Sequence, residues 1–229
     1  MTAGGFSAGQ LARMIAVRFI GGILVLGAVF FLPAGTFDYW EAWVYMGLIL
    51  LPAMFIVGYL IRHDPALIER RTRMKEREAR QDLIIKISMV FFLAMILLPG
   101  LDRRFGWSDV PTAVVIAADL VVALGYFLVF LVYRENTYTS RVVEVEKGQT
   151  VISTGPYAIV RHPMYLGAMA MILFTPLALG SYWDILPALF FIPIIVARLL
   201  NEEQVLGKGL PGYPEYMQKV RYRIIPGIW

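Results

Sequence analysis

The sequence predicts an all-α membrane protein, a multi-pass transmembrane helical bundle of about six spans. Apolar residues make up 59% of the 229 residues and charged residues only 17%, against about 25% charged in an average soluble domain. The apolar residues are also grouped in runs close to the roughly 20 residues that cross a hydrocarbon core of about 30 Å. Since lipid offers no hydrogen bonds to an open sheet edge, these runs are expected to be helices.

Six apolar segments define the expected spans. The first is preceded by a short polar stretch and lacks a small-residue cleavage site, so we expect it to remain as a span rather than to be removed as a signal peptide. The last two are short and are separated only by the turn 181–184, which predicts a tight helical hairpin. The segments are residues 13–32, 42–61, 83–100, 112–133, 164–180 and 185–200.

The basic residues of the loops predict the orientation. Loop 62–86 holds eight Lys and Arg residues, whereas loop 33–41 and turn 181–184 hold none and loop 101–111 holds only Arg103 and Arg104. Because Lys and Arg near span ends stay on the cytoplasmic side, we expect both termini in the cytoplasm, most simply at the cell (inner) membrane. Aromatic residues mark the opposite interface: Tyr39, Trp40, Trp43, Trp107, Tyr182 and Trp183.

The chain is expected to have two parts. Residues 1–133 hold the N-terminal spans, and residues 134–229 hold a binding loop, the helical hairpin and the tail. In the first part, Asp64 as an N-cap and Pro65 in the first turn predict a basic surface helix over 65–82. The second part opens with loop 134–163, whose β-branched residues, glycines and prolines predict an extended, turn-rich segment. Long ordered loops on a scaffold often carry binding groups.

Composition excludes several classes of function. The chain has no cysteine, so disulfides, thiolate metal ligands and a cysteine nucleophile are excluded, and we predict no metal site. The net charge of +4 comes from a few loops and fits anionic lipid headgroups better than nucleic acid. No obligate protein partner is implied. His63 is interpreted as a cap or interface residue, while Asp119, a carboxyl within a span, is left open between a structural and a functional role.

Two polar motifs lie at the predicted hairpin. Gly155-Pro156-Tyr157-Ala158-Ile159-Val160-Arg161-His162-Pro163-Met164-Tyr165-Leu166-Gly167 precedes and opens the fifth span, and Arg198-Leu199-Leu200-Asn201-Glu202-Glu203 closes the sixth. Since antiparallel helices joined by a short turn begin and end at one depth, the two motifs are expected to share a pocket. Arg198 and Glu202 are spaced to pair on one helix face, and the start of the fifth helix favours an anion.

These motifs, with Gly212-Tyr213-Pro214-Glu215-Tyr216 and Arg223-Ile224-Ile225-Pro226 in the tail, resemble the isoprenylcysteine carboxyl methyltransferases and their bacterial relatives. The resemblance covers roughly the last hundred residues. It implies an integral membrane enzyme with a cytoplasmic pocket for S-adenosylmethionine in its C-terminal part. Carried over, the family's pocket motifs fall on Arg161, His162, Pro163, Tyr165, Glu202 and Glu203. The chain has no Gly-x-Gly-x-x-Gly after a strand, so a soluble Rossmann methyltransferase is not supported.

The residue types suit the chemical groups of that cofactor. Arg161 or the adjacent helix start is expected to bind the carboxylate, Glu202 or Glu203 the ammonium, and His162 the adenosine. An aromatic face, Tyr157 or Tyr165, would cover adenine or lie near the sulfonium. The predicted cofactor-binding set is Tyr157, Val160, Arg161, His162, Tyr165, Glu202 and Glu203. For catalysis, Glu203 is the candidate base and Arg198 the group that steers an anionic acceptor.

The predicted reaction is methyl transfer to a lipophilic small molecule or a lipid-linked acceptor that arrives from the bilayer. The acceptor stays open among a prenylated cysteine, a phospholipid amine, a quinone or phenol, and a small thiol. A sterol-reductase-like enzyme using NADPH is the main alternative, because residues 222–228 resemble the end of such proteins. A non-catalytic membrane scaffold is the third hypothesis.

Overall fold

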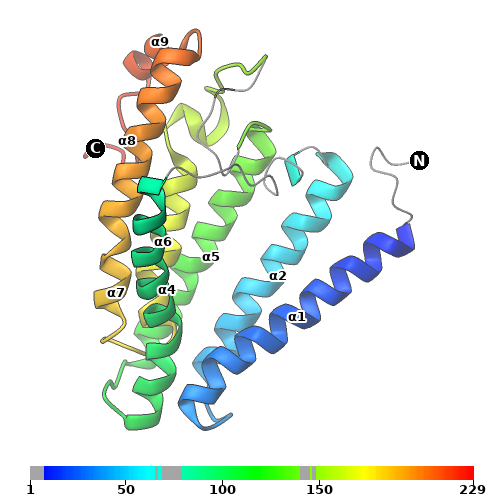
Figure 1. Ribbon diagram of the computed structural model, residues 1–229, viewed down its shortest axis with the longest axis vertical. Coiled ribbons are helices and arrows are strands. Elements are labelled where there is room, and N and C mark those ends of the chain that lie inside the picture. Colours follow the sequence, from blue (N-terminus) through cyan, green and yellow to red (C-terminus); the bar gives the residue numbers. More distant parts are fainter. Residues whose placement is uncertain (1–7, 65–66, 69–78, 140–144, 146–147) are drawn as a thin grey trace.

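The computed structural model describes residues 8–64, 67–68, 79–139, 145 and 148–229, and its regular elements are all helical over that part of the chain (Figure 1). Predicted surface helix 65–82 lies mostly outside the described residues. Within it, Leu67 donates its backbone N–H to Asp64 Oδ1 at 3.0 Å, as an N-cap at Asp64 requires. The helices are α1 (Ala8–Ala34), α2 (Trp40–His63), α4 (Ala79–Phe105), α5 (Thr112–Glu135), η1 (Gly155–Ala158), α6 (Pro163–Ala178), α7 (Ile185–Leu189), α8 (Phe191–Gly209) and α9 (Tyr213–Lys219).

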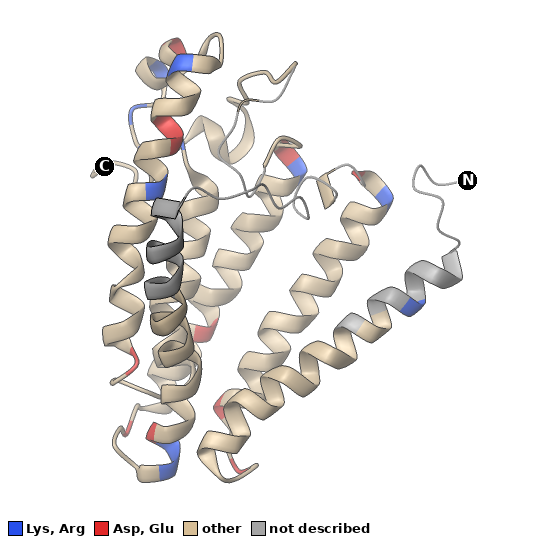
Figure 2. Cartoon of the chain, viewed as in Figure 1, with Lys and Arg blue, Asp and Glu red and all other residues tan. Residues whose placement is uncertain are grey.

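The helices run alternately up and down the long axis of the molecule, so the predicted helical bundle is confirmed (Figure 1). We call the end where α5 and α8 finish and α6 begins the site end, and the other the far end. By length and composition, Trp40–His63, Thr112–Glu135 and Ile185–Gly209 can each cross a membrane. The apolar helices Phe19–Ala34 and Pro163–Ala178 are shorter than a full span. Charged residues lie mainly at the two ends and leave the middle apolar (Figure 2).

The sixth predicted segment, 185–200, differs from the helix observed. It is interrupted at Phe190, between α7 and α8, and α8 continues to Gly209. Pro193 explains the interruption, because it has no N–H to donate to the carbonyl of Leu189 one turn earlier. The extension follows from residues 201–209, which are good helix formers but too polar to be recognised as part of a span.

Outward-facing apolar side chains cover the middle of the bundle. Leu24, Leu51, Leu120 and Phe127 are each 57–67% exposed. A soluble monomer rarely exposes so continuous an apolar surface. Hydrocarbon chains around the bundle remove the cost of this exposure, and the fold is therefore that of a membrane protein.

Helices α5 and α6 pack closely against each other. A Cβ placed on Gly125 would lie 2.9 Å from the carbonyl oxygen of Gly167, and a Cβ on Gly167 would lie 2.9 Å from that of Gly125. The two backbones therefore touch, as small residues allow between membrane helices. This contact holds the start of α6 beside the end of α5, where the loop with the first polar motif begins.

Candidate active site

The start of α6 is held by the C-terminal tail. Helix η1 has Pro156 as its second residue, and α6 has His162 at its N-cap and Pro163 at its first position. The backbone N–H groups of Arg161 and His162 donate to the carbonyls of Tyr222 and Arg223 at 2.9 and 2.8 Å. These two hydrogen bonds fix the residues before α6 against a segment sixty positions later in the chain.

Glu203, near the end of α8, is the centre of a buried ionic cluster. Its Oε1 accepts from Arg161 Nε at 2.7 Å and lies 3.3 Å from His162 Nε2. Its Oε2 accepts from Arg223 Nε at 2.8 Å. Arg161, His162 and Glu203 are each less than 9% exposed. The predicted convergence of the two motifs is thus present, in the form of a charge-assisted network of the kind that a buried carboxylate needs.

Arg161 has few donors left for a ligand. Its Nη1 donates to the carbonyl oxygens of Val220 and Arg221, both at 2.9 Å, and its Nε is engaged by Glu203. A guanidinium has five N–H donors, so this geometry leaves the two on Nη2. The backbone of the tail, which the sequence analysis did not place in the site, therefore takes up much of the hydrogen-bonding capacity of Arg161.

Glu202 lies beside this cluster and has different partners. Tyr165 donates its hydroxyl to Glu202 Oε2 at 2.6 Å and accepts from Arg198 Nε at 3.2 Å. The ring centres of His162 and Tyr165 are 5.7 Å apart, so Tyr165 lies between Glu202 and the Glu203 cluster. Glu202 is only half-buried, and its other carboxylate oxygen, Oε1, accepts no hydrogen bond from the described residues.

Tyr157 closes the side of the site nearest α5. Its hydroxyl accepts from Asn136 Nδ2 at 2.9 Å, and its carbonyl accepts from the Tyr216 hydroxyl at 2.8 Å. Burial raises the pKa of Tyr157 above its usual value, so its hydroxyl remains protonated. Val160 is 3% exposed and packs beneath the motif.

Three side chains of the tail and of α9 belong to the site but were not predicted there. Arg223 is a direct partner of Glu203, and its guanidinium also lies over the Trp229 ring at 5.3 Å. Tyr216 holds the carbonyl of Tyr157, and the Tyr213 hydroxyl is buried without a hydrogen-bond partner in the described chain. The tail motifs that carry the family resemblance contain these residues, so the signal was present but had not been tied to the pocket.

Asp119 is not part of this arrangement. It lies in the first third of α5, the helix whose other end reaches the site, and its Oδ1 is buried without a partner in the described chain. The structure therefore separates Asp119 from the candidate site, and the functional reading of this residue stays a prediction.

Comparison with known proteins places the site within a family match. Residues 113–210, less than half of the chain, match the phospholipid methyltransferase family. That family falls in the group of membrane methyltransferases that are similar to the isoprenylcysteine carboxyl methyltransferases, without singling out the latter enzymes. The match runs from α5 to the end of α8 and includes both polar motifs.

A sterol reductase is also similar to part of the chain. An alignment 106 positions long, which covers 42% of this chain, is 33% identical to Delta(14)-sterol reductase TM7SF2 of Mus musculus. The segment makes up 25% of that protein, so this chain spans about a quarter of the length of the curated relative that it matches. The comparisons therefore support a helical membrane protein with a methyltransferase-like C-terminal part.

Proposed function

We propose that the chain is an S-adenosylmethionine-dependent membrane methyltransferase that acts on a lipophilic small molecule or a lipid-linked acceptor. The observation that carries the proposal is that two neighbouring carboxylates have different surroundings. Glu203 is buried in an ionic cluster, whereas Glu202 is half-buried and hydrogen-bonded to Tyr165, which also contacts Arg198. Both carboxylates lie inside the segment that matches the phospholipid methyltransferases.

The residues present fit the polar groups of the cofactor. Glu202 has carboxylate capacity left for an ammonium, and Arg161 has its Nη2 donors left for a carboxylate, next to the positive end of the α6 dipole. The hydroxyl of Tyr213, buried and without a partner among the described residues, is a further donor at the site. S-adenosylmethionine supplies an electrophilic methyl group on a sulfonium. The protein would align the acceptor with this methyl group and keep water out.

The geometry favours a positioning role for Glu203 rather than the role of base expected from sequence. Both of its oxygens accept from cationic or ring N–H groups, and a carboxylate engaged in this way is poorly suited to take a proton. We assign it to holding Arg161, His162 and the tail in place. Arg198 is retained as the group that steers an anionic acceptor, because it lies on the exposed side of Tyr165.

The proposed orientation has the site end and both termini in the cytoplasm. It rests on the basic loops at that end, since Lys and Arg flanking spans stay inside. The acceptor would then reach the site from the cytoplasmic leaflet, between helices. A lipid-soluble molecule with a small polar head fits such a route.

A titration of detergent-purified protein tests the proposal. We expect saturable binding of S-adenosylmethionine and transfer of its labelled methyl group to a component of a total lipid extract. Glu202→Gln should weaken cofactor binding at least tenfold, the size expected for losing a charge-assisted contact. The matched control, Glu215→Gln, changes an exposed residue of α9 at the same end and should bind as the parent does.

The same titration decides between the alternatives. The similarity to a sterol reductase favours NADPH as the competing ligand, whose phosphates would seek basic groups rather than a second carboxylate. Saturable NADPH binding with no affinity for S-adenosylmethionine would overturn the proposal in favour of a reductase. Binding of neither cofactor would favour a scaffold.

A further inference from the structure

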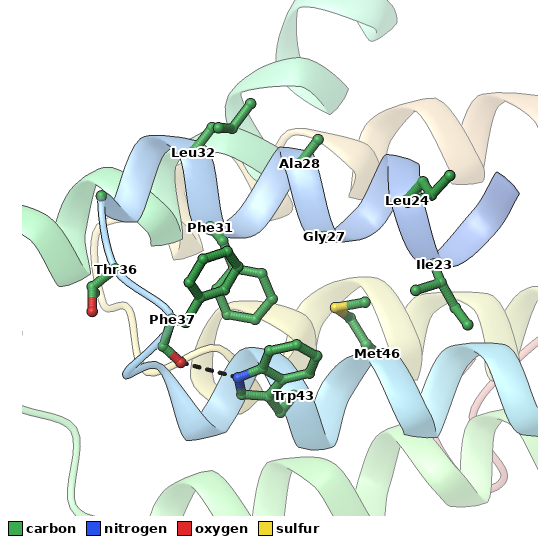
Figure 3. A pocket seen from close by; sticks show the side chains of 11 residues that line it. Ile23, Leu24, Gly27, Ala28, Phe31, Leu32, Thr36, Phe37, Trp43 and Met46 are labelled. Atoms are coloured by element: carbon green, nitrogen blue, oxygen red, sulfur yellow. Dashed lines mark hydrogen bonds between the residues drawn. The ribbon is translucent and has the colours of Figure 1, made fainter. Parts of the chain in front are cut away.

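An apolar groove lies between α1 and α2 at the far end, away from the candidate active site (Figure 3). Its volume is about 530 Å³, within the range of about 300–1,000 Å³ typical of ligand pockets. The side chains of Leu24, Phe31, Phe37, Trp43 and Met46 line it. A groove of this composition can hold a hydrocarbon chain.

The groove has a fixed aromatic wall. The Phe31 ring lies 4.5 Å from Trp43 and 5.3 Å from Phe37, and Trp43 Nε1 donates to the Phe37 carbonyl at 3.0 Å. Gly27 keeps the floor open, because a Cβ there would meet nothing nearer than the Met46 methyl at 4.0 Å. These contacts make the groove a formed feature of the α1–α2 pair.

The groove opens toward the bilayer. Leu24 and Leu32, on its α1 side, are 67% and 74% exposed. From Ile23 to Leu32 the helix rises about 14 Å at about 1.5 Å per residue, which is close to half of a hydrocarbon core of about 30 Å. An acyl chain of one leaflet therefore matches the groove in chemistry and in depth.

A cation without a carboxylate partner among the described residues lies at the end of the groove. Gly35 is part of the lining, and a Cβ on it would be 3.6 Å from Arg104 Nε. Arg104 is exposed, and its guanidinium lies 5.8 Å from the centre of the Phe105 ring, but it has no acidic partner or hydrogen bond in the described chain. Its neighbour Arg103, in contrast, donates to the Asp38 carbonyl at 2.9 Å and lies 3.9 Å from the Asp38 carboxylate.

We propose that the groove binds one acyl chain of an anionic membrane phospholipid, with the lipid phosphate against Arg104. The site lies in the leaflet opposite the candidate active site, so this lipid is a bound component and not the methyl acceptor. Binding would fasten α1 to α2 near the turn that joins them, at the far end (Figure 1). The inference does not depend on the reaction that the protein catalyses.

Fluorescence quenching tests this proposal directly. Full-length protein in detergent is titrated with phosphatidylglycerol that carries brominated acyl chains, because bromine quenches a nearby indole. We expect a saturable quenching component that is lost in Trp43→Phe. Brominated diacylglycerol, which lacks the phosphate, should require about fivefold more lipid for half-saturation, the size expected for one basic residue near a membrane surface.

Two pairs of variants locate the chain and the headgroup. Gly27→Leu fills the groove and should remove the saturable component, while Gly21→Leu, on the same helix but with nothing within 4 Å of a Cβ, should retain it. Arg104→Gln should raise the half-saturating concentration of phosphatidylglycerol about fivefold. Arg103→Gln should change it less than twofold, because that guanidinium is engaged by Asp38.

Three results would overturn the proposal. One is equal quenching in Gly27→Leu and Gly21→Leu, and another is equal affinity for phosphatidylglycerol and diacylglycerol. The third is a dimer, measured by light scattering, that Gly27→Leu converts to a monomer without any saturable lipid quenching. That result would assign the groove to a second copy of the chain.

Discussion

Glu202 and Glu203 are neighbours in sequence, yet they have different partners. Successive helical residues point about 100° apart, so Glu203 faces the start of α6 and the tail while Glu202 faces Tyr165 and Arg198. The sequence showed that two carboxylates lay near Arg161 and His162. It did not show that one would be neutralised by protein cations and the other left available, because the position of Arg223 depends on how the tail folds back.

Replacing each of the two carboxylates should therefore have a different effect. Glu203→Gln leaves Arg161 buried without its counter-charge, which we expect to lower the free energy of unfolding by about 3–5 kcal/mol. Glu202→Gln should alter stability by less than about 1 kcal/mol, because its pair is half-exposed. Thermal unfolding in detergent, followed by intrinsic fluorescence, measures both. Equal stability of the two variants would contradict the assignment of Glu203 to positioning.

Asp184, at the far end, should make stability depend on pH. Burial, and then the nearby Asp102 carboxylate, raise the pKa of Asp184 to about 9, and neither of its oxygens has a partner in the described chain. The folded chain thus holds this proton more tightly than the unfolded chain, where an aspartate titrates near about 3.9. The stabilisation that comes from protonated Asp184 is complete below about pH 4 and declines as the pH rises toward 9.

Asp184→Asn should remove this dependence. The melting temperature of the parent is expected to fall between pH 5 and pH 8, whereas that of the variant should fall less. Asp109→Asn, an exposed change at the same end, is the control and should follow the parent. A parent that is more stable at pH 8 than at pH 5 would show that Asp184 is ionised in the folded protein.

At the scale of elements, the apolar runs of the sequence predicted six segments, and the structure has helix in each of the six. The end of α8 and the break at Phe190 were missed for a physical reason. Hydropathy detects only the part of a helix that meets lipid, while residues 201–209 are held in the helix by contacts with the tail, such as that of Glu203 with Arg223.

The contact between α5 and α6 should tolerate little added volume. Gly167→Ala places a methyl group 2.9 Å from both the Gly125 carbonyl oxygen and a Val129 methyl, so we expect a loss of about 1–3 kcal/mol of stability from overpacking. Gly47→Ala, where a Cβ meets nothing within 4 Å, should be neutral or slightly stabilising because alanine favours helix. Thermal unfolding of the two variants compares these effects, and equal stability would contradict the close approach.

For the whole molecule, the alternating helices bring both the start of α1 and the tail to the same half of the bundle (Figure 1). The loop charges predict which side this is, because basic residues flanking spans stay in the cytoplasm. The prediction is readily tested because the natural chain has no cysteine, so any cysteine introduced is a unique label.

Single cysteines at the two ends report the orientation. Asp109→Cys lies at the far end and Lys219→Cys on α9 at the site end, and both parent residues are exposed. On intact cells, a membrane-impermeant maleimide should label Asp109→Cys at least tenfold more than Lys219→Cys, and lysis should make the two equal. The reverse pattern would place the candidate site outside.

The sequence by itself determined the helical membrane architecture, because the length and apolar character of each segment leave a chain in lipid few other ways to satisfy its backbone. It also determined that the polar motifs at the two ends of the hairpin meet. Only the tertiary structure decided that the tail completes the site, that Glu203 is bound by two arginines and that α1 and α2 form a groove beside Arg104. These features arise between segments distant in the chain, where local patterns carry no information about which side chains will meet.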